Sequence, residues 1–367
     1  MIPIAKPYVG LEEQAAVADV LASGQLASGP RVHEFEHAFA EFCQSPAAVA
    51  CGSGTAGLVA AVAALDLPHG SKILTTPFSF IATANCILAS DCRPVFIDID
   101  PDTFNITAEG VKQAFERDPE IKAVLPVHLY GQACEIHEIT EIAHSYGASV
   151  IEDCAQAHGA TEDGVPVGAI GDLGVFSFYP TKNMMAGEGG MITGRNTELI
   201  ERCKLIIDHG SPVRYVHVRL GFNYRMTSMA AAIGLCQLQR LPAWNMQRRR
   251  NAESLTAVLA GQTWLDTPSE RPNCEHVYHQ YVLKVRERAR LQEHLTAAGV
   301  GTAVHYPRTI TAQPFYRDLG HSCDGHPIAC RMADEVLSLP VHPALTPDDL
   351  QTIITAMRAF EPEKARV

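Results

Sequence analysis

Between residues 47 and 153, short apolar runs alternate with segments of helical period, and this alternation limits the possible folds more than any other feature. Alternating strands and helices form a mostly parallel sheet with helices on both faces, because each right-handed crossover packs its helix against the sheet. We therefore expect an α/β fold with ligands at the carboxyl ends of the strands. The predicted strands are residues 47–51, 72–75, 94–99, 123–128 and 149–152, and the predicted helices are 55–65, 81–89, 108–117 and 136–146.

The length of 367 residues predicts two domains, because one hydrophobic core usually stops growing below this size. We predict a large α/β domain over residues 1–245 and a smaller α+β domain over residues 246–367. After residue 160 the pattern indicates strands at 175–179 and 190–193, a helix at 197–207 and a helical segment at 226–260, followed by ordered segments at 277–285, 289–298 and 347–360.

The composition argues against several classes of protein. Hydrophobic residues make up 47% and charged residues 19%, as in globular proteins, and the longest apolar run, residues 58–65, is too short to span a bilayer. The chain reaches Glu12 and Glu13 without the apolar core of a signal peptide, so we expect it to be cytoplasmic. A formal charge of −12 argues against a nucleic-acid surface, and residues 248–250, all arginine, are expected to form a solvated helix face.

The cysteines and histidines follow no metal-binding pattern. The eleven cysteines are scattered singly with no Cys-x-x-Cys pair, so we read them as reduced core residues. Among sixteen histidines there is no His-Glu-x-x-His motif, and no carboxylate cluster has the spacing of metal ligands. The sequence therefore predicts no metal site.

Lys182 lies between an apolar, strand-like run and a glycine-rich turn within residues 176–190. A lysine held in a cleft at such a place loses hydration, which lowers its pKa and makes its amine a nucleophile. This is the chemistry of Schiff-base formation. The alternative is an ordinary solvated lysine in a loop.

Two further segments suggest a ligand with a phosphate and a basic ring. Asp153 ends the strand predicted at 149–152, where its carboxylate would suit a protonated pyridine nitrogen, although it could also be a simple strand cap. Residues 52–56 (Gly-Ser-Gly-Thr-Ala) follow a predicted strand and open a predicted helix, whose free N–H groups attract phosphate. A plain helix N-cap is the alternative for this turn.

In combination these segments resemble the DegT-type nucleotide-sugar aminotransferase family, whose members are pyridoxal-phosphate enzymes of fold type I. The resemblance covers nearly the whole chain and implies that fold, a homodimer, and a role in polysaccharide or antibiotic sugar biosynthesis. It is carried by residues 4–7, 29–30, 53–55, 76–83, 94–98, 127–131, 152–159, 176–190, 221–226 and 337–343.

The resemblance implies a role for each matching residue around pyridoxal 5′-phosphate. Lys182 matches the lysine that bonds to the cofactor, and Asp153 the acid on the pyridine nitrogen. Gln156 matches the residue that faces the phenolic oxygen. Phe80 matches the aromatic residue that stacks on the ring, although a Phe before an apolar helix could equally be a core residue.

The phosphate of the cofactor has its own set of matching residues. Asn223 matches an asparagine that reaches the phosphate from the other subunit, which places the implied site at a dimer interface. His128 and His158 could line this pocket or be structural histidines. The remaining cofactor-binding matches are Ser53, Gly54, Thr55, Ala56 and Ser177.

The implied reaction moves an amino group from L-glutamate to a keto group of a nucleotide-linked sugar, with Lys182 as both nucleophile and base. Arg31, Arg225 and Arg308 are candidates for binding the substrate diphosphate. The alternatives are a dehydratase or a cyclitol aminotransferase of the same family, or a non-catalytic regulator with this fold. Since dehydratases of the family typically carry histidine in place of the lysine, the presence of Lys182 favours the aminotransferase.

Overall fold

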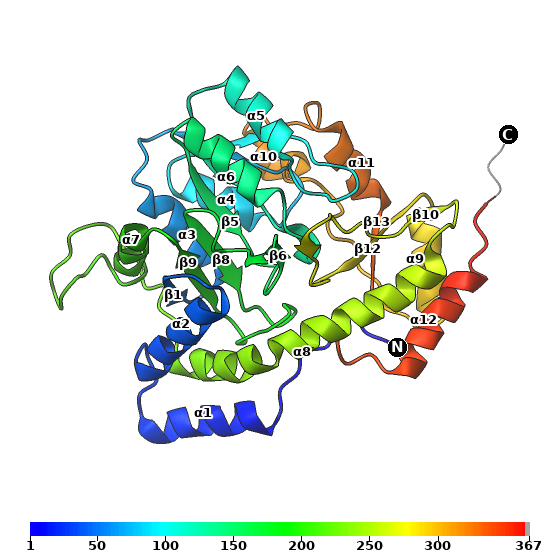
Figure 1. Cartoon of the computed structure of the whole chain (residues 1–367), viewed down its shortest axis with the longest axis horizontal. Helices are drawn as coiled ribbons and strands as arrows, with labels where there is room; N and C mark the ends of the chain where they lie inside the picture. Colours follow the sequence, from blue (N-terminus) through cyan, green and yellow to red (C-terminus); the bar gives the residue numbers. More distant parts are fainter. Residues whose placement is uncertain (364–367) are drawn as a thin grey trace.

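A seven-stranded sheet forms the centre of the chain, for which a computed structural model describes residues 1–363 (Figure 1). The strand order is β1-β9-β8-β5-β4-β2-β3, and only β9 runs antiparallel to its neighbours, so the expected α/β fold with a mostly parallel sheet is confirmed. The strands are β1 (Ala47–Cys51), β2 (Lys72–Thr75), β3 (Arg93–Phe96), β4 (Ile121–Leu125), β5 (Ser149–Asp153), β8 (Leu173–Ser177) and β9 (Gly190–Gly194).

Each face of the sheet has its own core because neighbouring residues of a strand point to opposite faces. Ile73 packs with α3 (Gly54–Ala64), α4 (Ala82–Ala89) and α7 (Thr197–Ile207). Leu74 packs on the other face with α5 (Ala108–Arg117) and α6 (Ile136–Ser145). Further along that face, β8 and β9 pack with α2 (Pro30–Phe42) and α8 (Ser228–Leu259). Helices thus cover both faces, as the alternation predicts.

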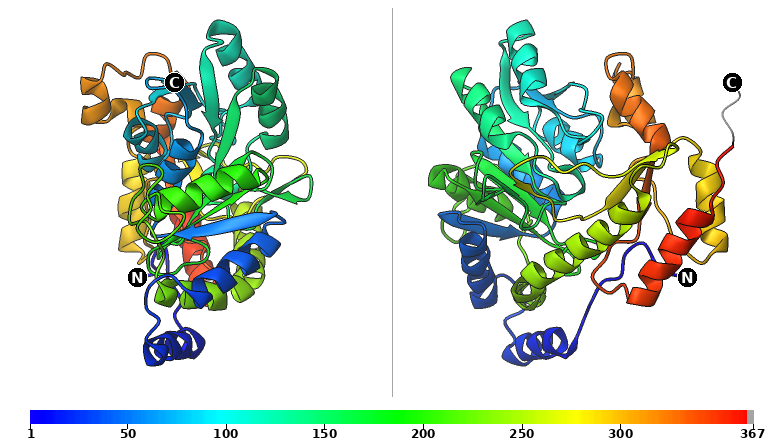
Figure 2. Two further views of the ribbon diagram at one scale, coloured as in Figure 1. Left: turned by 90° about the vertical axis from the view of Figure 1, so that its left-hand side faces the viewer. Right: turned by 45° about the vertical axis from the view of Figure 1, so that its right-hand side comes forward.

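A second body surrounds a three-stranded sheet of order β10-β12-β13 (Figure 2). Its strands β10 (Leu265–Asp266), β12 (Tyr281–Val285) and β13 (Val336–Leu339) share a core with α9 (Arg288–Ala297) and α12 (Pro347–Ala359). Helix α8 runs from the large sheet to this body and contains Pro242. The predicted division at residue 245 falls inside this helix, and the division stays a prediction.

The remaining elements are short or lie at the edges. The first helix, α1 (Leu11–Ser23), packs on α8, where the buried carboxylate of Glu13 accepts hydrogen bonds from Arg240 and Gln237. No helix in residues 1–363 has both the length and the apolar composition that a membrane crossing requires. The other elements are β6 (Thr161–Glu162), β7 (Val165–Pro166), β11 (Cys274–Glu275), η1 (Leu129–Gly131), η2 (Ile310–Ala312), α10 (Pro314–Asp318) and α11 (Pro327–Glu335).

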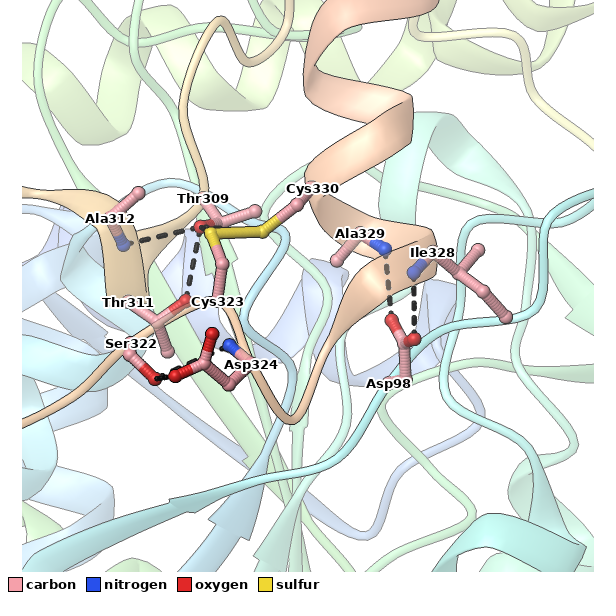
Figure 3. Close-up of a disulfide and its surroundings, with 10 residues drawn as sticks. All are labelled: Asp98, Thr309, Thr311, Ala312, Ser322, Cys323, Asp324, Ile328, Ala329 and Cys330. Atoms are coloured by element: carbon pink, nitrogen blue, oxygen red, sulfur yellow. Dashed lines mark hydrogen bonds between the residues drawn. A yellow bond between two sulfur atoms is a disulfide. The ribbon is translucent and has the colours of Figure 1, made fainter.

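One disulfide corrects the expectation that all cysteines are reduced (Figure 3). Cys323 and Cys330 are bonded, with the Sγ atoms 2.17 Å apart, and the bond closes the loop before α11. The hydroxyl of Thr309 lies 3.7 and 3.8 Å from the two sulfur atoms. The amides of Ile328 and Ala329 in the first turn of α11 donate to Asp98, which holds the start of the helix that carries Cys330. Cys51, Cys86, Cys154, Cys203 and Cys236 are free thiols.

We expect Ile73→Ala to lower the free energy of unfolding by about 2–5 kcal/mol, because the side chain is fully buried and its loss leaves a cavity. Lys122→Ala is the matched control, because Lys122 is exposed on β4, and it should change stability by less than about 0.5 kcal/mol. Urea unfolding of both variants at one protein concentration measures the difference. Equal stabilities would contradict the described core.

Candidate active site

A cavity of about 710 Å³ lies where the carboxyl ends of β1, β2, β4, β5 and β8 meet the second body. Its position agrees with the edge of the sheet that the sequence predicts for ligands. Ala56 and Asn223 are predicted site residues that do not line it. Eight other predicted residues do: Ser53, Gly54, Thr55, Phe80, Asp153, Gln156, Ser177 and Lys182.

Asp153 is buried at the end of β5, and its two oxygens have fixed partners. Oδ2 accepts a hydrogen bond from Thr83 Oγ1 at 2.8 Å, and Oδ1 accepts one from the amide of Ala155 at 3.1 Å. Because Thr83 donates its proton to Asp153, the 2.9 Å contact between Thr83 and Ser79 must be donated by Ser79 Oγ. Burial raises the pKa of Asp153 above its ordinary value, and the Thr83 bond and the charge of Lys182 oppose this rise.

The turn between β1 and α3 has the form of a phosphate-binding turn. Ser53 caps α3 by accepting a hydrogen bond from the amide of Ala56, so this amide is already satisfied. The earlier amides, of Gly54 and Thr55, have no acceptor within the helix and are available to an anion. Residue 54 must be glycine, since a Cβ there would lie 2.7 Å from the Cβ of Ser177. The close approach brings Ser177 to the same turn.

Lys182 follows β8 on a loop, and its own amide donates to the carbonyl of Tyr179 at 2.9 Å. Its side chain is half-buried and lines the cavity with Asp153. Burial lowers the pKa of Lys182 to about 8, and the negative charge of Asp153 acts in the opposite direction. An amine with this pKa is partly unprotonated near neutral pH, as a nucleophile and a base require.

Gln156 and Phe80 meet a wall of the cavity that comes from the second half of the chain. Gln156 Oε1 accepts a hydrogen bond from the amide of Tyr130 at 2.8 Å, and its Nε2 donates to Tyr306 Oη at 3.0 Å. Phe80 is 58% exposed, so it is not a core residue, and its ring centroid is 6.3 Å from that of Tyr306. Its face is thus available to a planar ligand.

His128 and His158 both take structural positions outside the cavity lining. His128 Nε2 is 2.9 Å from Glu152, whose oxygens also accept the amides of Gly168 and Gly171. The potential ligand atoms of His128, Glu152 and Cys154 lie within 4.8 Å of one another, the one such group among the described residues. Hydrogen bonds already engage this His–Glu pair; the absence of a metal site stays a prediction. His158 packs against aromatic rings, and burial lowers its pKa to about 3.

One of the arginines predicted to lie on a solvated helix face is buried. Arg248 is 6% exposed and donates to the carbonyl of Tyr278, which corrects the prediction of a solvated face for this residue. Arg31 pairs with Glu34, and Arg225 pairs with Asp208.

Several polar residues of the site are not among the site residues that the sequence predicts. Ser79 and Thr83 fall within residues 76–83, where the motif could have indicated them. His279, His305 and Tyr306 come from segments about one hundred residues after Lys182, and only tertiary packing brings them to the cavity.

Comparison with known proteins agrees with this geometry. The profile of the DegT/DnrJ/EryC1/StrS aminotransferase family matches residues 7–358. The chain belongs to this family. It is 37% identical over 365 residues to the pleiotropic regulatory protein of Geobacillus stearothermophilus, with 98% of each chain covered. It is 35% identical over 344 residues to the UDP-2-acetamido-2-deoxy-3-oxo-D-glucuronate aminotransferase of Pseudomonas aeruginosa, with 94% of each covered.

A solved structure extends the comparison to three dimensions. The chain superimposes on Streptomyces venezuelae DesV in complex with a ketimine intermediate with a TM-score of 0.92 at 33% identity, covering 95% of this chain and 93% of that one. The protein is therefore a sugar aminotransferase of a family that uses pyridoxal 5′-phosphate. The cavity fits this group, because it combines an acid, an aromatic face, a phosphate turn and an amine.

We expect Lys182 in the cofactor-free protein to react with an amine-specific reagent with a midpoint near pH 8, because burial favours its uncharged form. Peptide mass spectrometry after brief labelling across a pH series measures this midpoint. A short unstructured lysine peptide, whose side-chain pKa is about 10.4, serves as the external control and should be labelled only at much higher pH. Identical midpoints for Lys182 and the peptide would contradict the described environment.

Proposed function

We propose that this aminotransferase moves an amino group from L-glutamate to a keto group of a nucleotide-linked sugar. The observation that carries the proposal is the pairing of Lys182 and Asp153 in one cavity at the ends of the strands. The name of the Pseudomonas aeruginosa relative specifies a UDP-linked oxo sugar, which supports this class of acceptor.

Each residue has a distinct task in this proposal. When bound, pyridoxal 5′-phosphate supplies an electron sink for carbanion charge. Lys182 would bond to it covalently and then carry the proton between the reacting carbons, as its lowered pKa allows. The carboxylate of Asp153, fixed by Thr83, would hold the proton on the ring nitrogen.

The other predicted residues would hold the cofactor in place. The turn at Ser53, Gly54 and Thr55, with Ser177 beside it, would bind the phosphate through its free N–H groups and hydroxyls. Phe80 would cover one face of the ring, and Gln156 would face the phenolic oxygen. The role predicted for Ala56 is weaker, since its amide already donates to Ser53.

We propose further that the active unit is a homodimer in which Asn223 reaches the phosphate site of the other copy. Asn223 lies outside the cavity of its own chain. The segment before it, between α7 and α8, extends away from the molecule in Figure 1 and exposes Val213, Tyr215 and Leu220 by 61%, 80% and 77%. Exposed large apolar side chains that lie together are typical of a protein interface.

The charge of the cavity is a second argument for the proposed dimer. Among the described residues that line it, Lys182 is the one lysine or arginine, while Asp153 and Glu188 are acidic. A diphosphate and a carboxylate donor both need cations, so we propose that the second copy contributes them. Arg308 is a candidate on the same chain.

Incubation with glutamate and a panel of nucleotide-linked keto sugars should yield an amino sugar, detected by mass spectrometry as ketone replaced by amine. Lys182→Ala should fold with an unchanged circular dichroism spectrum but give no product, because the reacting amine is gone. A Lys182→Ala variant as active as the parent would refute the assignment. A wild-type protein that aminates none of the panel with any amino acid would instead favour the regulator alternative.

Mixing two inactive variants tests the shared site. A dimer of one Lys182→Ala subunit and one Asn223→Asp subunit has one site in which both native residues are present. Random mixing makes half of the dimers hybrid, so activity should recover to about a quarter of the wild-type value. Each variant alone is the control. No recovery after verified subunit exchange would mean that Asn223 does not act across an interface.

A further inference from the structure

The side-chain amide of Asn183, the residue after Lys182, has an orientation that its partners determine. Its Nδ2 lies 2.9 Å from Asn245 Oδ1 and 3.0 Å from the carbonyl of Val277. Asn245 in turn donates its own Nδ2 to the carbonyl of His158, so Oδ1 is the acceptor atom of Asn245. Both neighbours of Asn183 Nδ2 are therefore acceptors, and the oxygen of Asn183 must point the other way.

That oxygen faces the imidazole of His279 and fixes its tautomer. Asn183 Oδ1 is 3.1 Å from His279 Nδ1, and an amide oxygen can only accept, so Nδ1 carries the hydrogen. In a neutral ring the lone pair then lies on Nε2. The described neighbour of Nε2 is the amide nitrogen of Gln280 at 3.5 Å, which is long for a hydrogen bond.

The surroundings keep this ring neutral. His279 is 5% exposed, and the titratable groups that face it are Lys182, Arg248, His305 and His158, none of them an acid. Burial, together with the positive charges of Lys182 and Arg248, holds the pKa of His279 well below its ordinary value. Arg248 also approaches the carbonyl of His279 at 3.4 Å, close to the backbone that carries the ring.

We propose that Nε2 of His279 accepts a hydrogen bond from the amine of Lys182 and so positions that amine for proton transfer. Both side chains line the same cavity, and Asn183 joins them through the chain on one side and a hydrogen bond on the other. The inference rests on the proposed role of Lys182 as the proton carrier.

Such a hydrogen bond would help proton transfer because it fixes the direction of the amine. A free amine rotates about its last carbon–nitrogen bond, so its lone pair points at the reacting carbon only part of the time. One N–H donated to a fixed acceptor removes this rotation, and orientation of this kind contributes directly to rate. His279 is thus a positioning residue.

The neighbouring histidines are less suited to this task. His158 lies outside the cavity lining, against the rings of Phe176 and Phe178. His305 lines the cavity, but its Nδ1 is 2.8 Å from Ser338 Oγ, a hydroxyl that can donate or accept and so leaves the tautomer open. His279 alone among these three has both a place in the cavity and a tautomer fixed by an obligate acceptor.

Labelling of Lys182 in the cofactor-free protein tests the proposal without any turnover. An acceptor at Nε2 stabilises the ammonium form, so His279→Leu should lower the labelling midpoint of Lys182 by about one pH unit, the size expected for one hydrogen bond to a charged group. His279→Gln keeps an acceptor oxygen and should restore most of the shift. His158→Phe removes an equally buried imidazole that does not face the cavity, and it should leave the midpoint unchanged.

A second measurement reports the tautomer itself. Nitrogen-15 NMR of histidine-labelled cofactor-free protein should show His279 with a proton on Nδ1 alone, still so at a pH below the ordinary pKa of histidine. Asn183→Leu should abolish this preference. An unchanged Lys182 midpoint in His279→Leu, an equal shift in His158→Phe, or a proton on Nε2 would overturn the proposal.

The positioning role of His279 and the proposed amination of a keto sugar can be contradicted independently. If the labelling and NMR results hold but no keto sugar is aminated, the positioning of Lys182 stands and the substrate assignment falls. If amination is found but His279→Leu changes neither the midpoint nor kcat, the positioning role falls. When both hold, His279→Leu should lower kcat more than it changes the KM of either substrate, with partial rescue by His279→Gln.

Discussion

Opposite charges that share one cavity constrain each other's protonation in this protein. Without the positive charge of Lys182, burial would raise the pKa of Asp153 further. Without the negative charge of Asp153, burial would lower the pKa of Lys182 further. Each group therefore limits the effect of burial on the other. The result is an acid that can stay ionised and an amine that can lose its proton near neutral pH, which are the two states that the roles proposed for these residues need.

The fold makes this pairing possible by bringing five strand ends to one edge. Asp153 is the last residue of β5, and Lys182 follows the end of β8, the strand that pairs with β5. The turn before α3 approaches Ser177 so closely that Gly54 cannot carry a side chain. Local geometry thus gathers the predicted residues before the second body adds any contact.

The second body completes the cavity with neutral polar groups. His279, His305 and Tyr306 line the cavity, and Tyr306 Oη accepts a hydrogen bond from Gln156. Burial lowers the pKa of His305 to about 4 and raises the pKa of Tyr306, so both side chains remain uncharged near neutral pH. A wall of uncharged donors and acceptors is suited to the hydroxyl groups of a sugar.

Sequence patterns predicted what is local and missed what depends on distant packing. Strands β1 and β2 and helices α5 and α7 were predicted at their observed bounds, because their apolar periodicity is strong and each ends in clear turn residues. Lys182 and Asp153 were predicted because each lies at a strand end within a short motif. The disulfide was missed because a spacing of seven residues does not indicate a pair, and the burial of Arg248 was missed because the buried stripe of α8 includes Asn245 and Asn251, which interrupt the apolar pattern.

The single proline of α8 weakens the hydrogen bonding of this helix at one turn. Pro242 has no amide hydrogen, so the carbonyl of Leu238 loses its partner one turn earlier, and the helix is least stiff at this point. The same helix joins the large sheet to the body around β12, and Pro242 lies between the part of α8 that packs on α1 and α2 and the part that packs on α12. Any bend of α8 would therefore be centred on this one turn rather than spread along its length.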